Sequence, residues 1–250
     1  MESEFFEEER EMGDIEDINK IKEQNLMILA KDLTKIYEIG DFIVKAVDSV
    51  SLEVKVGQTF VIKGFSGAGK TTLLNLIGGL DSPNQGVIYS NGVKITNMNE
   101  ESLALFRLMN SGFIFQNYNL ISTLTCEENI MFPMNLAGMT LKEQRKKAID
   151  LIEDIGLLER REHLPFQLSA GEQQRVAIAR ALANDPPIIM ADEPTANLDK
   201  KTRELILDLF KMMKNDEKTL IIATHDEKII ELADRLITFE EGKIIETVNK

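Results

Sequence analysis

From residue 26 onward, apolar residues follow two different spacings along the chain. Short runs in which they are continuous or alternate with polar residues predict strands at residues 27–30, 43–47, 50–54, 59–63, 112–116, 187–191, 219–224, 235–239 and 243–246. Residues 86–95 predict a further hairpin, because Asn91-Gly92 is a strong turn signal between two apolar runs. Helical spacing occurs between these strands, at residues 72–77, 100–109, 141–155, 170–182, 201–213 and 227–233.

The order of these elements predicts an α/β fold. The runs at 59–63, 187–191 and 219–224 are apolar almost throughout, as expected of parallel strands buried on both faces. The earlier alternating strands and the hairpin predict an antiparallel β subdomain, and residues 117–184 predict an inserted helical subdomain. We therefore expect a single domain over residues 26–250. It divides into 26–116 (the β subdomain and the first part of the core), 117–184 (the helical subdomain) and 185–250 (the second part of the core).

The most informative stretch lies between the strand at 59–63 and the helix that follows it. It reads Gly64-Phe65-Ser66-Gly67-Ala68-Gly69-Lys70-Thr71-Thr72 and matches the pattern G-x-x-x-x-G-K-[ST]. The glycines let successive backbone N–H groups face inward, and with the helix N-terminus they form a nest for phosphates. Lys70 would contact the β- and γ-phosphates, and Thr71 would offer a hydroxyl to Mg²⁺. The stretch predicts a nucleotide site.

A second group of candidate residues follows the strand at 187–191. Asp192 lies where a parallel sheet would open, so it can hold Mg²⁺ directly or through water. Glu193 comes next and can act as the general base on an attacking water. Two acidic residues at a strand end could also be a solvated surface pair. Beside the phosphate-binding stretch, they instead predict a hydrolytic site.

Residues 168–182 resemble the signature region of ATP-binding cassette (ABC) ATPases. Leu168-Ser169-Ala170-Gly171-Glu172-Gln173-Gln174-Arg175 precedes an alanine-rich helix, with Ser169 in the N-cap position. The resemblance covers residues 26–246, and its motifs occur in the family's order. It implies an α/β P-loop NTPase (RecA-like) core with an antiparallel β subdomain and an inserted α-helical subdomain. It also implies that the chain binds ATP and Mg²⁺.

The resemblance assigns further roles by position. Tyr37 matches the aromatic residue that stacks on adenine, and Gln116 matches the glutamine that links Mg²⁺ and the attacking water to the helical subdomain. His225 matches the histidine that contacts the γ-phosphate. Each of these residues alone could equally be an ordinary strand-end or surface residue. The implied metal ligands are Thr71, Gln116 and Asp192, and the implied catalytic residues are Glu193, His225, Gln116 and Lys70.

In this family, a second subunit completes each site. The helix that begins after Ser169 would present its N-terminus to the ATP bound opposite. The resemblance therefore implies a homodimer that closes around two ATP molecules. The residues expected in trans are Ser169, Ala170, Gly171, Glu172 and Asp199. Ala170 and Glu172 stand where glycine and glutamine are usual, but neither departure removes a catalytic group.

A finer resemblance, at residues 74–81, 115–120 and 191–199, is to the lipoprotein-releasing and macrolide-export subgroup. There, a separate ATPase subunit docks on an integral membrane permease. This implies a cytoplasmic protein, peripheral on the inner face of the cell membrane. One alternative is a soluble ABC ATPase that acts on ribosomes or nucleic acid, and another is a regulatory nucleotide-binding protein with little turnover.

Composition bears on these alternatives. The net charge of −13 disfavours nucleic acid as the main partner, because duplex binding depends on lysine and arginine. More than half of this excess lies in residues 1–25, so we expect this segment to be an acidic, disordered tail that is frayed or weakly helical, with a docking peptide as the alternative. The segment has no apolar core of the kind that signal peptides contain. The single cysteine, Cys126, fits a reducing compartment.

Overall fold

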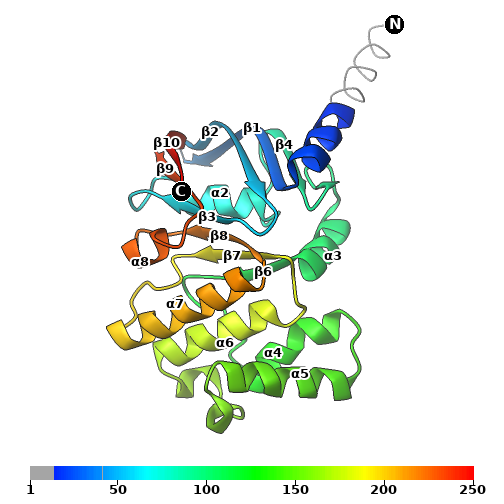
Figure 1. The fold of residues 1–250 in the computed structure, drawn as a ribbon, viewed down its shortest axis with the longest axis vertical. Helices are drawn as coiled ribbons and strands as arrows, with labels where there is room; N and C mark the ends of the chain where they lie inside the picture. The colour runs from blue at the N-terminus through cyan, green and yellow to red at the C-terminus, as the bar shows by residue number, and fades with distance from the viewer. Residues whose placement is uncertain (1–13, 41) are drawn as a thin grey trace, which may run out of the picture.

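The computed structural model describes residues 14–40 and 42–250, which form two sheets with helices around them (Figure 1). The larger sheet has six strands in the order β10 (Lys243–Asn249), β9 (Arg235–Glu240), β3 (Thr59–Lys63), β8 (Thr219–Ala223), β7 (Ile188–Asp192) and β6 (Ser111–Ile114). β10 is antiparallel to β9, and the other neighbouring pairs are parallel. The smaller sheet is antiparallel, in the order β2 (Phe42–Lys55), β1 (Leu26–Ile39), β4 (Gln85–Ser90) and β5 (Val93–Lys94).

Helix α2 (Lys70–Ile77) lies between the two sheets (Figure 1). Its apolar residues belong to the largest core cluster, which includes side chains of both sheets. Successive residues of a strand point to opposite faces. Phe60 and Ile62 of β3 accordingly belong to this cluster, whereas Val61 belongs to a second cluster. That second cluster joins the sheet to α6 (Ala170–Leu182), α7 (Lys200–Asn215) and α8 (Glu227–Ile230).

The helices furthest from the antiparallel sheet form a layer of their own (Figure 1). α4 (Cys126–Leu136) and α5 (Leu141–Asp154) pack with α6 around a third cluster. Both begin at a threonine whose hydroxyl accepts an N–H bond in a capping box. Two short 3₁₀ turns, η1 (Leu158–Arg160) and η2 (Pro165–Gln167), lead into α6, and α3 (Glu100–Asn110) precedes β6.

Residues 14–24 form a helix, so the disordered tail expected for residues 1–25 is wrong over this part. The helix packs beside β1 and β4 (Figure 1). Ile21 is buried with Leu29 and Tyr89, and Asp17 is buried in an ion pair with Lys31. Burial of these side chains supplies the stabilisation that an acidic composition alone does not indicate. Residues 1–13, the rest of that expectation, lie outside the described residues.

Two element lengths also differ from the sequence-based expectations. β1 and β2 are long strands whose pairing extends from Leu26 with Lys55 to Ile39 with Phe42. The sequence predicted only short strands there, because polar residues interrupt the apolar pattern. Helix α8 ends at Ile230, short of the predicted residue 233. Within residues 14–40 and 42–250, no helix combines the length and apolar character that crossing a membrane requires.

Candidate functional site

The phosphate-binding loop connects β3 to α2 and is held between two other strands. Gly67 and Gly69 have φ angles of 81° and 100°, and residues that have a Cβ rarely adopt such positive values. A Cβ at Gly69 would lie 2.2 Å from the carbonyl oxygen of Ala46 on β2, and one at Gly64 would lie 2.2 Å from that of Phe239 on β9. Glycine at these positions is therefore required by close backbone approach as well as by loop conformation.

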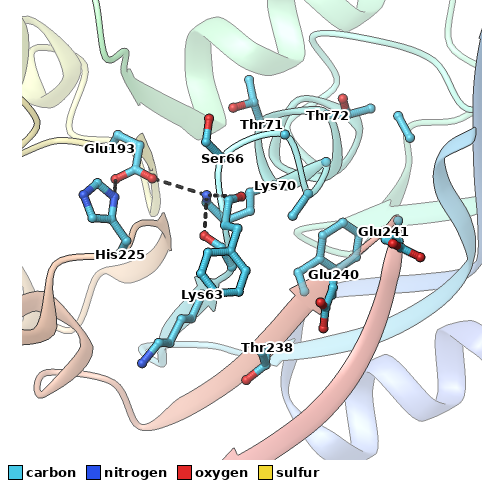
Figure 2. Close-up of a pocket in the computed structure, with 18 of the residues that line it drawn as sticks. Lys63, Ser66, Lys70, Thr71, Thr72, Glu193, His225, Thr238, Glu240 and Glu241 are labelled. Carbon is cyan, nitrogen blue, oxygen red and sulfur yellow. Dashed lines mark hydrogen bonds and ion pairs between the residues drawn. The ribbon is translucent and has the colours of Figure 1, made fainter. Parts of the chain in front are cut away.

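Lys70, Glu193 and His225 lie together at the start of α2 (Figure 2). The Lys70 ammonium donates to the carbonyl oxygens of Gly64 at 2.8 Å and Phe65 at 3.2 Å, and it lies 3.3 Å from Oε1 of Glu193. The other oxygen of Glu193, Oε2, is 2.9 Å from Nδ1 of His225. Glu193 follows β7 with a φ of 44°, a left-handed turn of the backbone. Its carboxylate thus faces both a buried cation and an imidazole.

Thr71 and Asp192 provide oxygen atoms that fit a magnesium ion. The Thr71 hydroxyl donates to Oδ2 of Asp192 at 2.8 Å. Oδ1 of Asp192 is buried and has no hydrogen-bond partner among the described residues. Burial raises the pKa of this carboxyl, and the hydrogen bond from Thr71 and the charge of Lys70 offset that effect only in part. In nucleotide sites, one or two such oxygens typically bind Mg²⁺ together with phosphate oxygens.

A cavity of about 940 Å³ lies beside these groups, and all of them except Asp192 line it. This volume is in the range of ligand pockets. All residues of the loop from Gly64 to Thr72 line it, and so do four of the residues predicted elsewhere: Tyr37, Gln116, Glu193 and His225. Gln116 lines the cavity from two residues beyond the end of β6, which stops at Ile114, short of the predicted residue 116. The cavity thus brings together predicted site residues from Tyr37 to His225.

The signature residues lie elsewhere, at the start of α6. Ser169 caps the helix: its hydroxyl accepts from the N–H of Glu172 at 3.3 Å, and the Glu172 carboxylate accepts the Ser169 N–H at 2.8 Å. Hydrogen bonds from the Ser169 backbone lower the pKa of Glu172. Ser169 and Ala170 are exposed, and none of residues 169–172 lines the cavity. The structure therefore separates them from the cavity of their own subunit.

Gly171 and Asp199 both contact Thr202 of α7. A Cβ at Gly171 would lie 2.5 Å from Cγ2 of Thr202, so this glycine permits α6 and α7 to approach. Asp199 caps α7 by accepting from the N–H groups of Lys201 and Thr202, and it also accepts from the Thr202 hydroxyl. The two segments predicted to act in trans thus form one continuous surface through Thr202.

Several charged residues that line the cavity belong to none of the sequence motifs. Lys63 lies at the end of β3 and pairs with Glu227 of α8 at 3.1 Å. Glu240 and Glu241 come from the turn between β9 and β10 (Figure 2). Their position depends on β9 lying beside β3, and no local signal in the sequence indicates that pairing.

The fold and site define a P-loop nucleotide-binding protein with an inserted helical layer. A family model described as ABC transporter matches residues 47–196. The chain belongs to the ABC transporter family, and it is an ATPase of that family.

Related proteins agree with this assignment. An uncharacterised ABC transporter ATP-binding protein of Thermotoga maritima is 46% identical over 213 residues, covering 85% of this chain and 91% of the relative. The macrolide export ATP-binding/permease protein MacB of Hyphomonas neptunium is 44% identical, covering 88% of this chain but 34% of MacB. A dimeric structure of the ATP-binding cassette MJ0796 in a post-hydrolysis state with ADP and Pi has a TM-score of 0.85 and 40% identity, covering 89% of this chain and 98% of that chain. These relatives support a transporter subunit rather than the ribosomal alternative.

Proposed function

We propose that this chain hydrolyses ATP with Mg²⁺ as a homodimer and couples hydrolysis to a separate membrane permease on the inner face of the cell membrane. The observation that carries the proposal is the placement of Glu193, whose two carboxylate oxygens face Lys70 and His225. A general base needs a defined position beside the reacting phosphate. Lys70, the adjacent cation, would neutralise charge on that phosphate.

Each group has a distinct role in the proposed reaction. Glu193 accepts the proton of the water that attacks the γ-phosphate. His225 holds Oε2 of Glu193 in place and faces the same phosphate. Thr71, Asp192 and Gln116 would hold Mg²⁺, which supplies positive charge to the β- and γ-phosphate oxygens. Tyr37, which also lines the cavity, supplies a ring for the adenine base to stack on.

The dimer is supported by the location of the signature segment. The helix N-terminus after Ser169 is exposed and favours anions, yet it does not face the cavity of its own subunit. A second subunit, arranged head to tail, would place Ser169 and Asp199 against the γ-phosphate side of the opposite cavity. MJ0796, whose fold is similar, has been solved as a dimer with ADP and Pi.

Substitution of Glu193, the proposed general base, tests this function. Glu193→Gln keeps the size of the side chain but cannot accept the proton, so ATP hydrolysis should fall by a factor of about 10² or more. ATP binding should persist, and the variant should remain dimeric in sedimentation experiments when Mg²⁺ and ATP are present. Hydrolysis at the wild-type rate would show that Glu193 is not the base. A monomer under these conditions would contradict the dimer.

A groove on the helical side is the proposed permease contact. It has a volume of about 350 Å³, and its apolar lining includes Phe113, Phe115, Phe132 and Leu136. Phe132 and Leu136 are exposed, as expected of a protein-binding surface. Two consecutive residues link the groove to the cavity, because Phe115 lines the groove and Gln116 lines the cavity. A partner seated there could therefore respond to nucleotide.

The partner is proposed to be a permease because MacB is named as both an ATP-binding and a permease protein, and this chain matches 34% of its length. Leu136→Lys should abolish recovery of a multispanning protein from detergent extracts, since it places a charge on the apolar rim. ATP hydrolysis by the isolated chain should persist. Recovery of ribosomes instead of a membrane protein would favour the alternative function.

A further inference from the structure

The side chains of Lys35, Tyr37 and Asp81 form a connected group at the edge of the phosphate site, where the Tyr37 hydroxyl also interacts with the Thr72 side chain. The Tyr37 hydroxyl donates to Oδ2 of Asp81 at 2.7 Å. The Lys35 ammonium donates to Oδ1 of the same carboxylate at 2.6 Å and to the carbonyl oxygen of Ser82 at 2.8 Å. The ammonium also lies over the tyrosine ring, 5.2 Å from its centre, in the geometry of a cation–π contact. One carboxylate thus holds both the hydroxyl and the cation.

The group connects two parts of the fold. Tyr37 and Lys35 lie on β1, whereas Asp81 follows the C-terminal end of α2, the helix that begins at the phosphate-binding loop. Tyr37 lines the nucleotide cavity, but Lys35 and Asp81 do not. The ammonium therefore occupies a position over the ring outside the cavity. It leaves the cavity side of the ring for a ligand.

The protonation states suit these contacts at neutral pH. Burial and the hydrogen bond to Asp81 raise the pKa of Tyr37, so its hydroxyl keeps the donated proton. Burial opposes ionisation of Asp81, but the bonds from Lys35 and Tyr37 outweigh it and hold the pKa of this carboxyl below its ordinary value. The pair therefore stays a neutral donor and a charged acceptor. Hydrogen bonds of this type are stronger than those between neutral groups.

We propose that Asp81 and Lys35 are positioning residues that fix the Tyr37 ring before the nucleotide binds, so that the adenine base stacks on a ring already in place. The proposal rests on the role assigned to Tyr37 above. A free tyrosine side chain must lose rotamer freedom when a base stacks on it, and a fixed one has lost it already. Affinity for the base should accordingly depend on Asp81, a residue that does not line the cavity.

The chain contains a matched control for this group. The Tyr89 hydroxyl donates to Asp14, Lys94 pairs with Asp14, and the Lys94 ammonium lies 5.8 Å from the Tyr89 ring centre. The chemistry is the same, but Tyr89 does not line the cavity. Tyr89→Phe therefore removes a comparable hydrogen bond without touching the proposed platform.

The test compares affinities for ATP and for inorganic tripolyphosphate, which has the phosphates without the base. Tyr37→Phe and Asp81→Ala should each weaken ATP binding by about three- to tenfold, the effect of one hydrogen bond. Binding of tripolyphosphate should stay the same in Asp81→Ala, which keeps the interaction of the Tyr37 hydroxyl with Thr72 of the phosphate-binding loop. The double variant should be no weaker than the weaker single variant, because both act through one bond. Tyr89→Phe should leave both affinities unchanged.

Other outcomes separate this inference from the proposed function. If Tyr37→Ala weakens ATP binding but Tyr37→Phe and Asp81→Ala do not, the ring is the platform and the positioning role is wrong. If tripolyphosphate binding falls as much as ATP binding, Asp81 acts only through the fold of α2, and the inference is overturned. If even Tyr37→Ala leaves ATP binding unchanged, the assignment of Tyr37 in the proposed function fails.

Discussion

Asp192 and Glu193 are adjacent acidic residues with different surroundings. Asp192 ends β7 and is 9% exposed, with one oxygen bonded to Thr71 and the other without a partner in the described structure. Glu193 turns away with a positive φ and faces Lys70 and His225. The sequence predicted two roles for this pair from their order at a strand end. The left-handed turn that separates them was not predictable, because glutamate rarely adopts it.

The proposed metal role of Asp192 predicts a specific change in Asp192→Asn. Loss of the carboxylate charge should raise the Mg²⁺ concentration needed for half-maximal ATP hydrolysis by about tenfold or more. Without Mg²⁺, thermal stability should rise or stay the same, because the substitution removes a buried charge that its surroundings compensate only in part. Hydrolysis titrated with Mg²⁺ and thermal unfolding without Mg²⁺ measure the two effects. An unchanged Mg²⁺ requirement would contradict the assignment, and Thr71→Ser, which keeps the hydroxyl, should resemble wild type.

At the scale of elements, the start of α6 combines a local and a long-range feature. The sequence predicted the N-cap at Ser169 because serine before an apolar helical pattern is a strong local signal. The structure adds the reciprocal hydrogen bond, in which the Glu172 carboxylate accepts the Ser169 N–H and completes the capping box. The contact of Gly171 with Thr202 could not be predicted, since it depends on how α7 packs beside α6.

The capping box predicts a pH-dependent contribution to stability. Hydrogen bonds from Ser169 lower the pKa of Glu172 in the folded state below the ordinary value of a glutamate, about 4.3. The carboxylate therefore stabilises the fold above about that pH, and the contribution is lost as the pH falls through the folded-state pKa. Glu172→Ala should lower the midpoint of thermal unfolding by about 2–4 °C at pH 7. The difference in midpoint between the wild type and Glu172→Ala should shrink towards pH 4.

The same experiment has an internal comparison in α5. Hydrogen bonds from Thr140 lower the pKa of Glu143 in a second capping box. Glu143→Ala should therefore show the same trend with pH. A stability difference for Glu172→Ala that stays constant between pH 7 and pH 4 would mean that its ionised carboxylate does not stabilise α6.

At the scale of the whole molecule, the order of elements was predictable and their arrangement was only partly so. The apolar runs and the phosphate-binding motif indicated strands, helices and a parallel core, because these signals are local. The pairing of β3 with β8 and β9 joins residues far apart in sequence and has no local signal. The sequence predicted only a weak helix at 14–24 because its acidic residues suggested disorder, whereas its packing depends on Leu29 and Tyr89.

The N-terminal helix predicts an effect on stability without an effect on catalysis. Ile21 is 8% exposed between the helix and the antiparallel sheet, remote from the residues of the nucleotide cavity. Ile21→Ala should lower the thermal midpoint by roughly 4–8 °C, the effect of removing buried methyl groups. ATP hydrolysis at 25 °C should be unchanged. Ile18→Ala, at a 38% exposed position of the same helix, should shift the midpoint much less. Equal shifts for both variants would contradict the packing.

The central claim is that each ATP site is built from two subunits. It is tested most directly by mixing two inactive variants. Glu193→Gln lacks the base, and Ser169→Asp keeps an N-cap but places a negative charge against the triphosphate of the opposite subunit. In a mixed dimer, one site would carry both defects, and the other would carry neither.

Hydrolysis by the mixture is therefore the decisive measurement. The hydrolysis rate of each variant alone should be lower than that of the wild type by a factor of about 10² or more. Mixing the two variants before ATP is added should restore a substantial fraction of the wild-type rate. Activity should depend on the ratio of the two variants and be greatest near equal amounts. If the mixture is no more active than the sum of its components, the two halves of the site do not come from different subunits.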